Sequence, residues 1–126
     1  MQTVEIMEKT FQAESGDIAL YLAMSKKAAD EGDNDTARYF YNVAMDEARH
    51  AAEFATLLGK VKDTRSNLAM MLEGEINSEK EKAQAKDVAL AEGHHEASQL
   101  FEKTMHDERR HTAEIKSVLS KLQEKD

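Results

Sequence analysis

The chain has 126 residues, enough for one compact domain, and its net charge of −8 argues against nucleic acid or anionic lipid as a partner. Cysteine is absent, which excludes disulfides, thiolate catalysis and metal centres held by cysteine. Proline is also absent and glycine scarce, a composition typical of long helices with short connections. Without a signal-peptide pattern or an apolar run near the roughly 20 residues of a membrane span, we expect a soluble, cytoplasmic, single-domain protein over residues 1–126.

Residues 3–60 are predicted to form a helical hairpin, because apolar residues recur every three or four positions in two successive stretches. The first helix is predicted over residues 3–31 and ends at Gly32, and the second over residues 35–58. Ionisable residues interrupt both apolar stripes: Glu14 in the first, and Glu47 with His50 in the second.

Residues 64–123 are predicted to form a second hairpin of the same kind. Thr64 or Ser66 is expected to cap a helix over residues 65–92, and Gly93 separates it from a helix over residues 95–123. The polar stretch 78–82 gives no clear buried face. Here the residues that interrupt the apolar stripes are Glu75 in the third helix, and Glu108 with His111 in the fourth.

An internal repeat relates the two hairpins. A shift of 61 residues, from Glu47 to Glu108, aligns residues 7–60 with residues 68–121 without a gap. The same shift aligns Glu14 with Glu75 and His50 with His111. Two related helical hairpins pack most simply as an all-α four-helix bundle.

The repeated Glu-x-x-His pattern is the candidate functional motif, because a Glu and a His three apart lie on one helical face. By itself the pattern arises easily by chance in so Glu-rich a chain, but here both copies fall on apolar stripes at matching positions. Four carboxylates facing a low-dielectric core repel one another and lose hydration. Two divalent ions would balance them and two imidazoles would complete the ligand set, which suits iron or manganese, with zinc also accepted. We therefore predict six metal ligands: Glu14, Glu47, His50, Glu75, Glu108 and His111.

The alternative is that these residues are solvated or form buried salt bridges with Lys and Arg. It is disfavoured because the cationic residues mostly avoid the stripes. The other histidines, His94, His95 and His106, are expected on the surface. Asp46 and Asp107, which precede the two motif glutamates, are predicted to accept a hydrogen bond from the histidine of the other repeat.

Several stretches resemble the rubrerythrin domain of the ferritin-like diiron superfamily, and the resemblance covers nearly the whole chain. In the first hairpin they are Ala13-Glu14-Ser15, with Tyr21 seven residues after the Glu. In the second they are the segment from Asp63 to Leu68 and the triplet Glu73-Gly74-Glu75. The resemblance implies a ferritin-like four-helix bundle whose six ligands bind two iron ions, and it implies that Tyr21 hydrogen-bonds a ligating carboxylate.

The chain departs from the family pattern in three places. No rubredoxin module accompanies it. The family carries a further Glu three residues after the first one in the third helix, where this chain has Ser78, so Glu79 is a candidate additional ligand if the helix is overwound or bulged there. The tyrosine of the third helix is also missing, with Lys82 and Ala83 in that region.

The short connection between the hairpins predicts how the bundle is completed. In the ferritin-like arrangement the second and third helices run parallel, and the few residues between them do not climb the length of the bundle. Either the third helix turns back antiparallel, or two chains exchange hairpins. Short-linker members of the family resemble the second case, so we predict a hairpin-swapped homodimer in which each chain completes the other's metal site.

The function predicted is that of a non-haem diiron oxidoreductase that reduces hydrogen peroxide, with no catalytic residues beyond the metal ligands. Electrons would come from an external donor such as a rubredoxin. One alternative is an oxygen-dependent ferroxidase or iron-handling protein. Another is a helical dimer whose metals are only structural.

Overall fold

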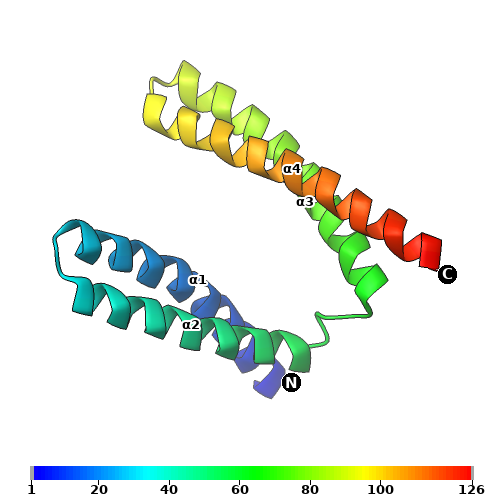
Figure 1. The fold of residues 1–126 in the computed structure, drawn as a ribbon, viewed down its shortest axis with the longest axis horizontal. Helices are drawn as coiled ribbons and strands as arrows, with labels where there is room; N and C mark the ends of the chain where they lie inside the picture. Colours follow the sequence, from blue (N-terminus) through cyan, green and yellow to red (C-terminus); the bar gives the residue numbers. More distant parts are fainter. Residues whose placement is uncertain (1, 126) are drawn as a thin grey trace. The chain divides into compact units, whose positions relative to one another are not determined.

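A computed structural model describes residues 2–125, with the side chain of Lys125 excepted, and these residues form four α-helices (Figure 1). Their bounds are α1 Gln2–Asp30, α2 Asn34–Leu57, α3 Thr64–Ala91 and α4 His95–Lys125. The chain divides into two compact units, residues 1–61 and 62–126. In each unit two consecutive helices pack side by side as a hairpin, α1 with α2 and α3 with α4.

Glycines in the turns and capping side chains explain where the helices end and begin. Gly32 and Gly93 occupy equivalent hairpin corners with φ of 85° and 81°, a backbone conformation that only glycine adopts without strain. Asp33 then begins α2 by accepting a hydrogen bond from the Thr36 amide at 3.0 Å. For α3 the expected cap was wrong, because Asp63 is the N-cap and accepts from the Ser66 amide at 2.9 Å.

The side chains buried between the helices of each hairpin are mostly small. Ala28 and Ala44 are buried in the first hairpin, and the repeat-related Ala89 and Met105 are buried in the second. A serine crosses each hairpin near its corner. Ser25 donates to the Ala37 carbonyl at 2.7 Å, and Ser98 donates to the Lys86 carbonyl at 3.0 Å. A shift of 61 residues aligns Ser25 with Lys86 and Ala37 with Ser98. The two hydrogen bonds therefore join equivalent positions, but the serine lies on the first helix of one hairpin and on the second helix of the other.

The connection between α2 and α3 is anchored within each unit. Lys60 donates to Glu8 at 2.8 Å and its ammonium lies 5.1 Å from the centroid of the Phe11 ring. Asn67 holds the backbone of Lys62 through two hydrogen bonds, of 2.7 and 2.9 Å. These contacts shorten the part of the connection that is free to extend.

Large apolar side chains are only partly covered. Among the described residues, none of the large side chains is fully buried, whereas Leu20, Met24 and Leu90 are about half exposed. A hairpin of two helices buries one narrow seam, and most helical stability in proteins comes from packing an amphipathic face against further elements. Within residues 2–125, no helix has the length and apolar character required to cross a membrane.

Candidate metal centre

The first hairpin gathers three of the predicted ligands. Glu14 comes from α1, and Glu47 and His50 lie one turn apart on α2. One ligand atom from each of the three lies within 4.8 Å of the other two. His50 Nδ1 is 3.5 Å from Glu14 Oε2 and 4.0 Å from Glu47 Oε1. Two carboxylates and an imidazole therefore converge on one small volume.

Electrostatics within this cluster are unfavourable without a cation. The pKa of Glu47 is raised, chiefly because its carboxyl group shares a hydrogen bond with that of Glu14, and further by desolvation and by the charges of Glu14 and Asp17. His50 opposes this shift. Glu14 Oε2 is buried, and no donor among the described residues satisfies it. A buried carboxylate oxygen without a donor beside a second carboxylate is a cation-binding arrangement.

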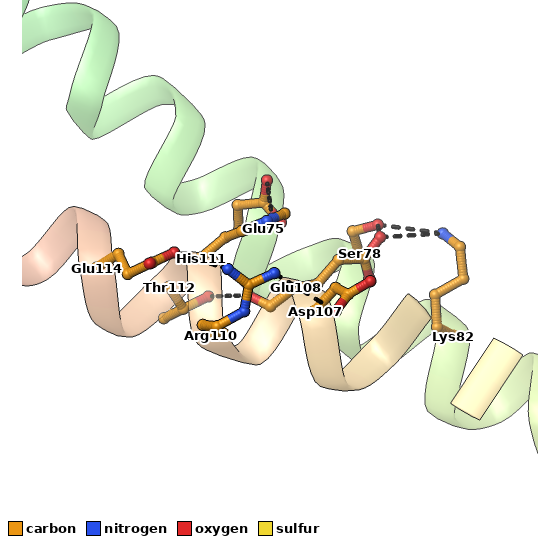
Figure 2. Close-up of polar contacts among 9 residues, drawn as sticks. All are labelled: Glu75, Ser78, Lys82, Asp107, Glu108, Arg110, His111, Thr112 and Glu114. Atoms are coloured by element: carbon orange, nitrogen blue, oxygen red, sulfur yellow. Dashed lines mark hydrogen bonds and ion pairs between the residues drawn. The ribbon is translucent and has the colours of Figure 1, made fainter. Parts of the chain in front are cut away.

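The second hairpin holds the repeat-related ligands in a different state (Figure 2). Glu75 Oε1 lies 3.3 Å from His111 Nδ1, which repeats the contact between Glu14 and His50. Glu108, however, accepts a hydrogen bond from Ser78 Oγ at 2.7 Å, and its Oε1 lies 3.8 Å from Lys82 Nζ. Within the described chain, only the first hairpin brings three such ligand atoms within 4.8 Å of one another. The expectation that cationic residues avoid the ligand stripes is therefore wrong for Lys82.

The residues present fit a metal ion. Glu108 Oε2, like Glu14 Oε2, is buried and accepts no hydrogen bond within residues 2–125. Each hairpin thus has one unsatisfied carboxylate oxygen and one histidine whose side chain is 43% exposed. Carboxylate and imidazole are the ligands of non-haem iron and manganese sites.

Glu79 is engaged elsewhere in the structure. Its carboxylate accepts a hydrogen bond from Arg109 Nε at 2.7 Å, and α3 is continuous α-helix through this point, without a bulge. Its role as an additional ligand stays a prediction, one that requires the Arg109 contact to break.

The other predicted site residues lie near the ligands without a settled role. Asp46 and Asp107 are more than half exposed, and each lies 3.5 Å from an arginine three residues later on its own helix. The Tyr21 ring contacts that of Phe40, with centroids 6.1 Å apart. The hydrogen bonds predicted for these three residues stay predictions. His94, His95 and His106 are exposed, as expected.

Sequence reasoning missed the cluster of Ser78 and Lys82 around Glu108. The signal was present in the repeat, since a shift of 61 residues places Ser78 at the position of Asp17 and Lys82 at that of Tyr21. The substitution of a carboxylate by a hydroxyl, and of a phenol by an ammonium, changes the charge beside an otherwise duplicated ligand set.

A Glu from one helix and a Glu-x-x-His from the next, present in both hairpins, is the ligand pattern of ferritin-like carboxylate metalloproteins. The chain belongs to the rubrerythrin family, whose pattern it matches over residues 5–119. Family membership and the four helices confirm the predicted all-α, ferritin-like fold class.

Two relatives illustrate the range of similarity. An uncharacterized protein of Methanocaldococcus jannaschii is 35% identical over 116 residues, which cover 91% of this chain and 82% of the relative. Reverse rubrerythrin-1 of Clostridium acetobutylicum is 29% identical over 122 residues, which cover 95% of this chain and 67% of the relative. Iron binding follows as the family's expectation for the ligand set described above.

Proposed function

We propose that this protein is a non-haem diiron oxidoreductase that reduces hydrogen peroxide to water. The observation that carries the proposal is the convergence of Glu14, Glu47 and His50, with a buried carboxylate oxygen that lacks a donor, in a member of the rubrerythrin family. Glu75, Glu108 and His111 supply a second set of the same composition. Six such ligands hold two iron ions, and manganese or zinc fits the same donors.

Two ferrous ions, when bound, supply the two electrons that convert one peroxide and two protons into two waters. The chain's own residues would keep four carboxylates and two histidines in reach of the ions, and the four carboxylates match the charge of two ferrous ions. We propose that the reducing electrons come from a separate donor such as a rubredoxin.

The two ligand sets are proposed to meet across a homodimer. If α2 and α3 run parallel, as in a ferritin-like bundle, the chain must travel back along the 24 residues of α2, a rise of about 36 Å. Residues 58–63 between the helices extend to about 25 Å at most. The anchoring of Lys60 and Lys62 shortens this further. Exchange of hairpins between two chains removes the conflict.

Exposed apolar surface beside the first ligand set supports the same arrangement. A hollow of about 350 Å³ is lined by Asp17, Leu20, Tyr21, Met24 and Phe40. Leu20 and Met24 are 58% and 45% exposed, which is costly for side chains this large when they are grouped together. A hairpin of a second copy would cover this hollow and bring its own Glu75, Glu108 and His111 toward the first set.

Stopped-flow absorption of the anaerobically loaded, diferrous protein tests the activity. Peroxide is expected to oxidise the iron much faster than dioxygen does, and Glu47→Gln to remove the rapid phase. Glu53→Gln, an exposed carboxylate on the same helix, serves as the matched control and is expected to retain it. Faster oxidation by dioxygen would favour the ferroxidase or iron-handling alternative. Iron that neither oxidant reaches, in a protein that unfolds on chelation, would make the metal structural and contradict the proposal.

A further inference from the structure

The electrostatic environment differs between the two ligand sets although their ligands are repeated. Around Glu47 the structure places two further carboxylates, Glu14 and Asp17, both of which raise the pKa of Glu47. At the positions related to Asp17 and Tyr21, the second hairpin carries Ser78 and Lys82. The first environment therefore combines three carboxylates, and the second combines two carboxylates with an ammonium group.

Lys82 is positioned by a hydrogen bond as well as by its charge. Its Nζ donates to Ser78 Oγ at 3.1 Å, and Ser78 Oγ donates in turn to Glu108 Oε1 at 2.7 Å (Figure 2). The Lys82 side chain is 27% exposed and that of Glu108 is 13% exposed, so water screens the pair only partly. The ammonium group lies 3.8 Å from the Glu108 oxygen, within the distance of a direct ion pair.

We propose that Lys82 is a tethered counter-ion that makes the two halves of the metal centre bind their ions with unequal affinity. This inference rests on the proposed metal centre. Among the residues that the structure describes, no lysine or arginine forms an ion pair with Glu14 or Glu47, so the half formed by Glu14, Glu47 and His50 takes its ion first and tightly. In the other half, a divalent ion must compete with Lys82 for Glu108, and it also meets the repulsion of the ammonium charge.

The ion of the second half is therefore the exchangeable one. Ser78 keeps a hydroxyl beside Glu108 when Lys82 withdraws, so the carboxylate remains positioned while its second oxygen, the buried Oε2, is available to the metal. Lys82 consequently acts through Glu108 as a positioning residue and is not a ligand.

Anaerobic titration of the metal-free protein of residues 1–126 with Co²⁺, followed by calorimetry and visible absorption, tests the inference without reference to activity. The wild type is expected to show two classes of site that differ at least about ten-fold in affinity. His50→Ala should remove the tight class and His111→Ala the weak class. Lys82→Gln should strengthen the weak class about ten-fold, whereas Lys82→Arg and the exposed control Lys80→Gln should leave it unchanged.

Separate outcomes distinguish failure of the inference from failure of the proposed function. A folded wild-type protein that binds no Co²⁺ would overturn the metal centre itself. Co²⁺ sites that all bind with equal affinity would overturn the role of Lys82 and leave the metal centre standing. So would a weak class whose affinity is unchanged by Lys82→Gln. Should Lys82→Gln fail to fold by circular dichroism, Tyr21→Lys provides the reverse test. It places an ammonium in the first half and should weaken the tight class.

Discussion

The two hairpins share a scaffold and differ in charge. Ala28 and Ala89 are buried at the same place in each, and glycine with positive φ forms both corners. Glutamate and histidine also make the same contact, at 3.5 Å between Glu14 and His50 and at 3.3 Å between Glu75 and His111. Yet the first hairpin leaves two carboxyl groups facing each other, and the second satisfies one with Ser78 and Lys82. Repetition has preserved the ligands, while the residues one and two turns after the glutamate of the first helix in each hairpin have diverged.

The largest effect is expected from removing a ligand of the first hairpin. Glu14→Ala should weaken the tight class of metal site by more than the roughly 10–100-fold that loss of an outer-shell partner costs. Calorimetric titration with Co²⁺ measures it, with Glu53→Gln as the control. An affinity within a few-fold of wild type would show that this cluster is not the tight half.

The same substitution should have opposite effects on the metal-free stability of the two hairpins. Glu47→Gln removes a charge that faces Glu14 and should raise the melting temperature in the presence of a chelator. Glu108→Gln removes the partner of the partly buried Lys82 and should cost about 1 kcal/mol after allowance for screening. Thermal melts followed by circular dichroism compare the two variants. Shifts of the same sign would contradict the contrast between the hairpins.

The pH dependence of metal-free stability should identify Glu47 as the strained group. Its pKa is raised in the folded protein, so the folded state binds this proton more tightly than the unfolded state does. The resulting stabilisation is fully present below the ordinary pKa of 4.5 and is lost as the pH rises through the raised value. The gain in metal-free stability of Glu47→Gln over wild type should therefore be larger at pH 7 than at pH 4. A stability difference between the two proteins that does not change with pH would refute this.

The smallest effects are expected at the helix caps, where the hairpins are alike. Hydrogen bonds from Thr36 lower the pKa of Asp33, and hydrogen bonds from Ser66 lower that of Asp63. Each cap contributes stability above the ordinary pKa of an aspartate, and this is lost as the pH falls through the lowered value. Asp33→Ala and Asp63→Ala should each lower the melting temperature by a few degrees at pH 7, without changing metal affinity. A change in Co²⁺ affinity in either variant would contradict this, because it would show that the helix cap influences the metal site.

Much of the fold was accessible from the sequence because its determinants are local. The stripe spacing and the glycines at 32 and 93 placed every helix boundary within two residues of its position in the structure. The six candidate ligands were predicted from ionisable residues on apolar stripes, and the structure groups three of them, Glu14, Glu47 and His50. The Ser78–Glu108 and Lys82–Glu108 contacts were not predicted, because a lysine next to a polar run is expected to point to solvent. Its position depends on the register of α3 against α4, which a single-helix pattern does not contain.

The central claim is that hairpins from two chains form one metal centre, and complementation between two defective chains tests it most directly. One chain carries Glu47→Gln with His50→Ala, and the other carries Glu108→Gln with His111→Ala. Each is unfolded, refolded alone or mixed in equal amounts, and loaded anaerobically with Fe²⁺, with wild type treated identically as the control.

In a hairpin-swapped heterodimer one centre contains both defective halves and the other contains both intact halves. Hairpin exchange therefore predicts that the mixture recovers the rapid oxidation of its iron by peroxide, which needs both ions of one centre and which neither chain shows alone. If each centre were built within one chain, every centre in the mixture would keep one defective half. A wild-type control that recovers the rapid oxidation by peroxide, beside a mixture that shows none of it, would contradict hairpin exchange.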